Sequence, residues 1–373
     1  MKFVFASDSF KGSLPSARIG QLLEDAARSV RPDAECVLLS IADGGEGTLD
    51  AIATVHGGNR VAIEAHDGLM RPVTSEVLIC ESEAFVECAS ACGLALLAPD
   101  ELDPMAATSY GVGECIREAL DRGCERITVG LGGSCTNDGG AGCMRALGAR
   151  LFDADGNELE GRGADLARIA RIDTQCLHPA VKAARFVVMS DVTNPLLGAQ
   201  GATYVFGRQK GADAETLEQL ESGMRTYAQA VAARCDDVDF DTPGYGAAGG
   251  LGMALAVFLG AQIRPGIEEL LSWFDFDNIL VGADLVVTGE GCLDEQSLHG
   301  KVVDGIAAHA RKAGVPVAVI CGTSTLDQEM LRSRGIVRVV EAAAGQELAH
   351  AMRHAEANYI AAARDLMESL TLY

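Results

Sequence analysis

Acidic and amide side chains recur in this chain inside short glycine-rich segments that directly follow apolar, strand-like runs. The segments of this form are SDSFKGS (7–13), IADGGEGT (41–48), GLGGSCTNDGG (130–140), SDVTNP (190–195) and TGEGCLDEQS (288–297). Open α/β sheets bind their ligands at the carboxyl ends of the strands, where such loops emerge. The pattern therefore predicts an α/β enzyme that binds phosphate, and with it Mg²⁺, through these loops.

The segment at 130–140 has the composition of an anion-binding loop. It follows the strand-like run RITV and precedes an expected helix, whose positive end would point toward a bound phosphate. Glycines let backbone N–H groups approach that phosphate, and hydroxyl and amide side chains add neutral donors. The expected phosphate-binding residues are Gly132, Gly133, Ser134, Thr136 and Asn137. The alternative is a turn and a helix cap made by Asp138 or Asn137.

Asp191 follows the strand-like run RFVVM and would project from a carboxyl end of the sheet. A carboxylate in this position can accept the proton of a substrate hydroxyl or hold Mg²⁺. Asn194 precedes Pro195, which holds its backbone extended. The alternative for this segment is an Asx turn without a chemical role.

Two further loops carry pairs of acids three or four residues apart. Asp43 and Glu46 follow the run CVLLS, and Glu290 and Asp294 follow the run DLVV. Mg²⁺ binds a few carboxylate oxygens and keeps several waters, so these acids are candidate metal ligands. The alternative is that they cap the helices that follow.

Three basic residues are candidate ligands for an anion. Lys11 is the strongest, because it lies among small residues beside a strand end in an acidic chain. Arg71 in GLMRP and Lys210 in GRQKGA are weaker candidates of the same kind. The alternative for each of them is a solvated surface charge.

The elements that must position these loops follow a βα rhythm at both ends of the chain. Between the ends, residues 59–94 hold strand-like runs separated by HDG and ESE, which is typical of an antiparallel meander. We therefore expect two α/β domains. One is a doubly wound, flavodoxin- or Rossmann-like parallel sheet made from residues 1–57 and 284–373. The other is an inserted, mixed α/β domain made from residues 58–283.

Composition excludes several classes of protein. The net charge is −23, which disfavours nucleic-acid binding because phosphate backbones need lysine and arginine surfaces. The 12 cysteines form no CxxC pair, which is typical of reduced thiols in a cytoplasmic protein. The apolar start is too short for a signal peptide, and the run GMALAVFLGAQI is too short to span a membrane. We expect a soluble cytoplasmic enzyme without nucleic-acid or membrane partners.

Nucleotide-binding motifs are absent or lack their usual context. GYGAAG (244–249) matches G-x-G-x-x-G, but DVDFDTP precedes it in place of a buried strand. The chain has no G-x-x-x-x-G-K-[ST] loop and lacks the H-R-D and D-F-G pair of protein kinases. A nicotinamide-dependent oxidoreductase therefore remains only an alternative, which NADH binding would support.

Six blocks of the sequence together resemble the signature segments of the bacterial glycerate kinases of the first type. In order, they are DSFKGSL, ADGGEGT, LGGSCTNDGGAG, DVTNPLLGAQGATYVFGRQKGA, GYGAAGGLG and ADLVVTGEGCLDEQSLHGK. They extend from residue 8 to residue 301, so the resemblance covers nearly the whole chain. The departures are Arg208 in place of Pro, Tyr245 in place of Ala or Gly, and Cys135 in place of Ala.

The resemblance implies ATP- and Mg²⁺-dependent phosphorylation of D-glycerate. For the enterobacterial-like members it implies transfer to the 2-hydroxyl, which gives 2-phospho-D-glycerate. It also implies two α/β domains with the active site in the cleft between them. Transfer to the 3-hydroxyl, giving 3-phosphoglycerate, and a non-catalytic sensor of a sugar acid are alternatives. Both a monomer and a homodimer are compatible with these implications.

The same resemblance implies a role for each candidate residue. Asp191 would be the base or the group that orients the hydroxyl, and Lys11 with Arg71 would hold the glycerate carboxylate. Further contacts to glycerate are expected from Asp8, Ser9, Asn194 and Asp294. The phosphates of ATP would lie on Gly132, Gly133, Ser134, Thr136 and Asn137. The metal ligands would be Asp43, Glu46 and Glu290.

Overall fold

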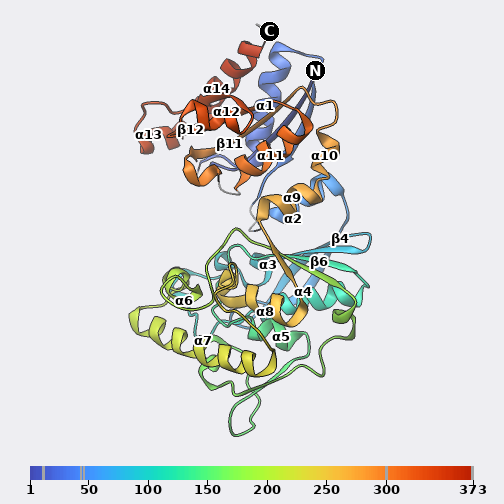
Figure 1. Cartoon of the computed structure of the whole chain (residues 1–373), viewed down its shortest axis with the longest axis vertical. Helices are drawn as coiled ribbons and strands as arrows, with labels where there is room; N and C mark the ends of the chain where they lie inside the picture. The colour runs from blue at the N-terminus through green and yellow to red at the C-terminus, as the bar shows by residue number, and fades with distance from the viewer. Residues whose placement is uncertain (11–12, 43, 45–46, 299–300, 371–373) are drawn as a thin grey trace. The chain divides into compact units, whose positions relative to one another are not determined.

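The computed structural model describes residues 1–10, 13–42, 44, 47–298 and 301–370. Three of the predicted site residues, Lys11, Asp43 and Glu46, lie outside these described residues. The chain divides into two compact units (Figure 1). The terminal unit consists of Met1–Ala42, Thr54–His56 and Pro265–Tyr373, and the central unit consists of Asp43–Ala53 and Gly57–Arg264.

The terminal unit is built on a 5-stranded sheet in which all neighbouring strands are parallel. In spatial order the strands are β13 (Ile336–Glu341), β12 (Val317–Ser324), β11 (Leu285–Leu293), β1 (Lys2–Ser7) and β2 (Glu35–Ser40). Numbered along the chain, this is the flavodoxin-like order, and the direction of winding reverses between β1 and β11. The predicted doubly wound sheet made by both ends of the chain is confirmed.

Helices cover this sheet because its strands are apolar on both faces. One face, which includes Phe3, Phe5 and Ile320, packs against α1 (Ser16–Val30) and α14 (Ala355–Ser369). α11 (Val302–Ala313) packs against β1, β11 and β12 and contributes no residue to that cluster. The remaining helices are α9 (Gly266–Trp273), α10 (Phe276–Ile279), α12 (Gln328–Ser333) and α13 (Leu348–Arg353).

The central unit is built on a 6-stranded mixed sheet. In spatial order the strands are β10 (Gln262–Arg264), β9 (Arg185–Met189), β6 (Arg126–Gly130), β5 (Glu83–Glu87), β4 (Pro72–Cys80) and β3 (Asn59–His66). β3, β4 and β5 form the predicted antiparallel meander, and β5, β6, β9 and β10 are parallel. The predicted mixed α/β architecture is therefore confirmed.

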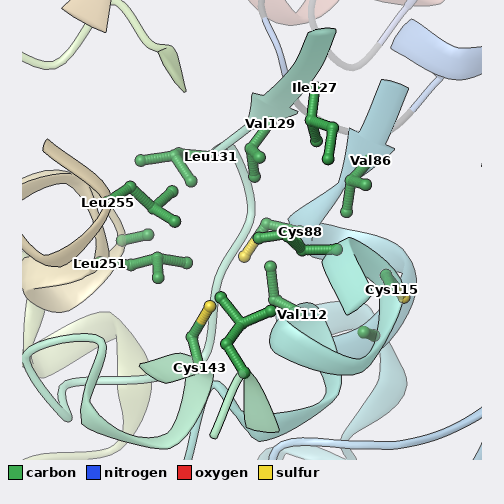
Figure 2. Close-up of a cluster of buried hydrophobic side chains, with 14 of the residues drawn as sticks. Val86, Cys88, Val112, Cys115, Ile127, Val129, Leu131, Cys143, Leu251 and Leu255 are labelled. Atoms are coloured by element: carbon green, nitrogen blue, oxygen red, sulfur yellow. The ribbon is translucent and has the colours of Figure 1, made fainter. Parts of the chain in front are cut away.

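One large apolar cluster holds the central unit together (Figure 2). Val86 and Val129 of the sheet meet Val112 from the helix that crosses it and Leu255 from a later helix. Burial of this cluster fixes the strands whose ends carry the predicted loops. Besides most of α2 (Thr48–His56), the α-helices of this unit are α3 (Cys88–Cys92), α4 (Tyr110–Asp121), α5 (Ala141–Ala146), α6 (Ala202–Phe206), α7 (Ala214–Arg234) and α8 (Leu251–Leu259).

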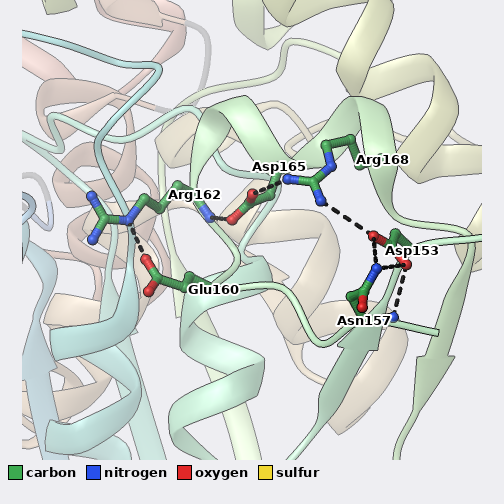
Figure 3. A network of polar contacts seen from close by, with 6 residues as sticks. All are labelled: Asp153, Asn157, Glu160, Arg162, Asp165 and Arg168. Carbon is green, nitrogen blue, oxygen red and sulfur yellow. Dashed lines mark hydrogen bonds and ion pairs between the residues drawn. The ribbon is translucent and has the colours of Figure 1, made fainter. Parts of the chain in front are cut away.

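A small antiparallel sheet of β7 (Arg150–Phe152) and β8 (Arg171–Asp173) extends the central unit. Figure 3 shows the polar contacts of the loop between these strands, which join Glu160, Arg162, Asp165, Arg168, Asp153 and Asn157. Hydrogen bonds from Asn157 lower the pKa of Asp153. These carboxylates are occupied by arginine and amide groups, so they hold the loop in shape and are not candidates for catalysis.

The boundary between the units differs from the sequence expectation at two places. Residues from Pro265 to Ala283 belong to the terminal unit, because a buried face of α9 packs against α11. A Cβ on Gly305 of α11 would lie 2.9 Å from Ile267, so the two helices approach closely. Most of α2 (Thr48–His56) belongs instead to the central unit. None of the helices in the described ranges has the length and apolar character needed to cross a membrane.

Candidate active site

The carboxyl ends of β1, β11 and β12 in the terminal unit open into a pocket of about 630 Å³. Its lining includes Asp8 and Ser9, which follow β1, and Glu290 in β11. A hydrogen bond of 2.9 Å from Asp8 N to Gly289 O joins the two strand ends. The strand order reverses at this point, and open α/β sheets bind their ligands there. The structure thus brings together three of the predicted site residues.

Glu290 has hydrogen-bonding capacity that the protein does not satisfy. Among the residues that the structure describes, its Oε1 is buried and has no hydrogen-bond partner. Burial raises the pKa of Glu290, and a hydrogen bond with Ser297 opposes this rise. A buried carboxylate oxygen without a partner is costly, and a bound hydroxyl or cation would remove the cost. Glu290 is therefore the strongest candidate for a ligand-binding group in this pocket.

The other polar residues near this pocket already make local hydrogen bonds. Ser9 N and Ser9 Oγ donate to Asp8 Oδ1 at 2.6 and 3.3 Å. Asp294 is not in the lining, and its Oδ1 accepts a hydrogen bond from Ser297 N at 3.2 Å. This bond caps the short 3-10 helix Glu295–Leu298, so capping accounts for at least part of the role of Asp294.

Three of the predicted glycine-rich segments meet at one edge of the central sheet. β6 and β9 are neighbours, with Gly130 paired to Met189, so the loops that carry Gly132 and Asp191 leave the sheet together. Gly132 N donates to Gly44 O at 3.1 Å, and a Cβ on Gly44 would lie 3.0 Å from Met189 O. Gly44 has a φ of +85°, a conformation that favours glycine. Glycine in ADGGEGT therefore allows this segment to lie against both neighbouring loops.

The side chains of the predicted phosphate-binding loop point into the protein. Ser134, Thr136 and Asn137 are buried, whereas Gly133 is exposed. Asn137 Nδ2 donates to Thr203 Oγ1 at 3.1 Å, while Asn137 Oδ1 is buried without a partner among the described residues. The exposed part of this loop is therefore backbone, and backbone N–H groups are the donors that it can offer to an anion.

The GYGAAG segment packs against this loop. A Cβ on Gly249 would lie 2.1 Å from Thr136 O, and Gly139 N donates to Gly249 O at 2.9 Å. Ala248, Gly249 and Gly250 all have positive φ values, so the segment turns sharply before α8. Its glycines allow two loops to touch, which gives them a structural role that needs no dinucleotide.

Asp138 anchors the buried side of the loop. Its carboxylate accepts hydrogen bonds from Ser109 N (2.7 Å), Ser109 Oγ (2.8 Å), Gly140 N (3.0 Å) and Gly142 N (3.2 Å). Burial raises the pKa of Asp138, and these hydrogen bonds oppose that rise. These contacts agree with the alternative in which Asp138 caps and fixes the turn. They also hold the start of α5 beside the start of α4.

Lys210 lies behind the same loop and is almost completely buried. Its Nζ donates to Thr136 O at 2.6 Å and to Ser134 Oγ at 3.3 Å. Burial lowers the pKa of Lys210, and the nearby cysteines and Asp138 oppose this fall. From the sequence, Lys210 is a weak candidate because a lone lysine is usually a solvated surface charge, whereas here it is buried. Its charge next to the loop favours an anion there.

The remaining predicted residues lie on the surface of the central unit. Asp191 is exposed directly after β9. Asn194 Nδ2 donates to Gln200 O at 2.8 Å, which stabilises the loop rather than reaching outward. Arg71 is paired with Asp67 (2.6 Å) and Glu101 (2.7 Å), so two carboxylates already neutralise its charge.

No described group of three or more His, Cys, Asp or Glu side chains is arranged to hold a metal ion. Mg²⁺ does not need such a cage, because it commonly binds one or two carboxylates together with phosphate oxygens and waters. Glu290, with an unpartnered oxygen, and Asp8 line the same pocket and fit that pattern.

Comparison with known proteins gives one consistent result. The sequence model described as "Glycerate kinase family" matches residues 3–371. "Glycerate 2-kinase" from Escherichia coli (strain K12) is 40% identical, with 100% of this chain and 98% of the relative covered. "Glycerate kinase" from Bacillus subtilis (strain 168) is 39% identical with the same coverage.

The structural comparison agrees. A crystal structure assigned as glycerate kinase 2 from Salmonella typhimurium LT2 superposes with a TM-score of 0.86 and is 41% identical. The match covers 100% of this chain and 98% of that one. Sequence blocks, sheet order and full-length similarity point the same way: the chain is an enzyme and belongs to the glycerate kinase family.

Proposed function

We propose that this enzyme transfers the γ-phosphoryl group of ATP to the 2-hydroxyl of D-glycerate, giving 2-phospho-D-glycerate and ADP. The observation that carries the proposal is the meeting of Gly44, the Gly132 loop and Asp191 at one edge of the central sheet. A base and an anion-binding loop placed side by side suit phosphoryl transfer, which depends on positioning and charge neutralisation. The full-length relative from Escherichia coli, named glycerate 2-kinase, supports the choice of substrate and hydroxyl.

Asp191 is the proposed base. The glycerate hydroxyl oxygen would form a bond to the γ-phosphorus as the bond from that phosphorus to the β–γ bridging oxygen breaks. The hydroxyl proton would pass to the Asp191 carboxylate, and ADP would leave with the bridging oxygen. Asp191 is exposed at the end of β9, the position in which a base for the substrate hydroxyl is expected.

The loop Gly132, Gly133, Ser134, Thr136 and Asn137 is the proposed contact for the ATP phosphates. Its buried side chains shape the turn, and its backbone faces outward at Gly133. Lys210, held under the loop by Thr136 O, contributes positive charge from inside the protein. This combination of N–H groups and an interior cation favours a phosphate without a lysine side chain on the surface.

Glycerate would be held by groups from several of the loops. Lys11, with help from Arg71, is the proposed partner of the carboxylate. The proposed partners of the hydroxyls and neighbouring atoms are Asp8, Ser9, Asn194 and Asp294. Of the pair of basic residues, Arg71 contributes less, because Asp67 and Glu101 already bind it.

Glu290 is the proposed Mg²⁺ ligand among the described residues, and Asp43 and Glu46, which lie outside them, are the other two proposed ligands. When bound, the ion would supply positive charge that neutralises the charge developing on the phosphate oxygens. The unpartnered Oε1 of Glu290 supports this assignment, because a buried anionic oxygen gains most from a cation.

The working form would be a cytoplasmic enzyme, monomeric or homodimeric, that uses small-molecule substrates and no nucleic acid. The net charge of −23 supports the absence of a nucleic-acid partner. The cysteines are free thiols, which supports a reducing compartment.

The test is a reaction with ATP, Mg²⁺ and D-glycerate, followed by ADP release and by NMR of the product. We expect ADP formation that depends on glycerate, with the phosphorus coupled to the proton on carbon 2. Coupling to the protons on carbon 3 would instead identify a glycerate 3-kinase. Absence of glycerate-dependent ADP formation would refute the proposed activity, and NADH binding would favour the oxidoreductase alternative.

A further inference from the structure

The pocket of the terminal unit has an apolar wall that its acids do not explain. Beyond Asp8, Ser9 and Glu290, the lining includes Ala342, Ala343, Leu348, Ala351, Met352 and Ala355. Leu348, Ala351 and Met352 lie in α13 at the spacing of one helix face, and Ala355 begins α14. An apolar helix face usually lies against the protein core, but this one lines a cavity.

The exposure of this wall is unusual for residues of its kind. Leu348 is 73% exposed and Met352 is 42% exposed, so both leave large apolar surface in water. Apolar surface around a cavity is a common property of ligand sites, where a bound group removes it from water. The wall therefore points to an occupant with an apolar surface of its own.

Glycerate does not have such a surface. It is a three-carbon acid with two hydroxyls and a carboxylate, and the charged side chains among the described lining residues are acids. The volume of about 630 Å³ is in the range of sites for much larger ligands. Of the two substrates in the proposed reaction, only ATP carries a flat, apolar ring.

The width of the sheet fits the same occupant. The apolar wall follows β13, and Glu290 lies in β11, two strands away. Two strand spacings are about 10 Å, which a nucleoside can span and glycerate cannot. A nucleotide that lies with its base on the wall would direct its phosphates toward the acids, where a metal ion is proposed.

We infer that this pocket receives the nucleoside of the phosphate donor, with the base against Leu348 and Met352. The inference rests on the proposed function for the identity of the donor. Gln346 and Asn358 also line the pocket, and Asn358 Nδ2 donates to Gln346 Oε1 at 3.0 Å. Their side-chain amides can donate and accept hydrogen bonds, as the edge of a nucleotide base does. Neither the acids nor the glycine loop is required for this apolar contact.

A pair of methionines provides a matched test. Met352 lines the pocket, whereas Met330 of α12 does not, and the two are similarly exposed at 42% and 38%. In Met352→Glu we expect the Kd for ADP, measured by titration calorimetry, to rise at least about tenfold, because a carboxylate then faces the base. In Met330→Glu we expect a change of less than about twofold. Both substitutions are on exposed side chains, and equal melting temperatures would show that both variants fold.

The kinetic arm separates this inference from the proposed function. The KM for ATP should rise in Met352→Glu while the KM for D-glycerate stays within about twofold of the parent value. Equal ADP affinities in the two variants would overturn the nucleoside assignment while leaving glycerate phosphorylation in place. A rise in the KM for glycerate alone would also overturn it, by placing glycerate against the apolar wall. If the parent enzyme binds ADP through Met352 but does not phosphorylate glycerate, the proposed function fails and the pocket assignment stands.

Discussion

The carboxyl edges of the two sheets carry similar sequences but have different structures. At the edge of the terminal sheet, glycine-rich segments surround an open pocket, and the acid Glu290 keeps an unpartnered oxygen. At the edge of the central sheet, a glycine-rich loop is packed into the protein, with Asp138 and Lys210 bonded beneath it. The same residue types therefore line an open pocket at one edge and support the loop from inside the protein at the other.

The difference follows from what covers each edge. In the central unit the GYGAAG turn lies on the loop, and positive φ values allow the two backbones to touch at Gly249. In the terminal unit, the segment after β13 forms an apolar wall and leaves the strand ends accessible. At the central edge, the glycine-rich loop thus exposes backbone groups. At the terminal edge, side chains line the pocket.

The largest expected effect is at Asp191, the exposed acid at the otherwise closed central edge. For Asp191→Asn we expect kcat for glycerate phosphorylation to fall about 10²–10⁴-fold, because loss of a general base has this cost. The measurement is steady-state kinetics at saturating ATP and glycerate. Asp100→Asn, at another exposed acid of the same unit, is the control and should keep the parent rate. A fall of less than about tenfold would remove Asp191 from the role of base.

Asp138 tests whether the central edge is a structural support. Asp138→Ala should lower the free energy of unfolding by about 3 kcal/mol, because it leaves several buried donors without an acceptor. Urea unfolding measures this change, with Asp100→Ala as the exposed control. Near-parent stability would mean that the network does not hold the loop.

Glu290 should show the opposite behaviour, since an open site is not built for stability. Burial raises its pKa, so the folded state holds the proton more tightly than the unfolded chain does. Its contribution to stability is therefore most favourable below about pH 4 and is lost as pH rises through the raised pKa. Glu290→Gln should be more stable than the parent at pH 7 and equally stable at low pH, while its activity falls about tenfold.

The measurements for Glu290→Gln are urea unfolding at several pH values and ATP-dependent glycerate phosphorylation. Glu295→Gln, at an exposed acid in the following 3-10 helix, is the control. Loss of stability at pH 7 would mean that the carboxylate is satisfied in the protein. In that case the contrast between the two edges would not hold.

Arg71 should give the smallest effect. It is held by Asp67 and Glu101, and the pKa of Glu101 is lowered by hydrogen bonds from Ala98 and Arg71. The pair with Glu101 is exposed, and the buried Asp67 keeps hydrogen bonds from Leu69 N and Arg71 N, so Arg71→Ala should change stability only slightly. We expect the KM for glycerate to rise less than about threefold. A tenfold rise would show that Arg71 leaves its ion pairs to bind substrate.

The architecture could be predicted from the sequence because local patterns of apolar residues determine its strands and helices. Continuous apolar runs such as KFVFA predicted buried parallel strands, and the runs in residues 59–94 predicted the antiparallel meander. The family resemblance is confirmed, because the family model matches residues 3–371. It could be seen in the sequence because its blocks extend along most of the chain. The position of α9 was not predicted, because it depends on packing against α11, far away in sequence.

The arrangement within the candidate sites was less predictable. Local sequence placed every glycine-rich segment at a strand end, but strand order decides which segments meet. The burial of Ser134, Thr136 and Asn137 depends on the loop that covers them. The burial of Lys210 likewise depends on residues far away in sequence, such as Ser134, to which it donates a hydrogen bond. The residues of the apolar wall at Leu348 have the sequence pattern of an ordinary amphipathic helix, so the pattern does not predict that they line a pocket.

The order of the terminal sheet has a consequence for how the chain is made. β1 pairs with β11, so Phe3 lies opposite Leu285, and the first strand gains this neighbour only after most of the chain has been synthesised. Until then one edge of β1 has unpaired backbone groups, which are prone to wrong pairing. The central unit contains its own sheet and can fold during this wait. Synthesis from the N-terminus therefore completes the Gly132 loop before the pocket proposed for the nucleoside.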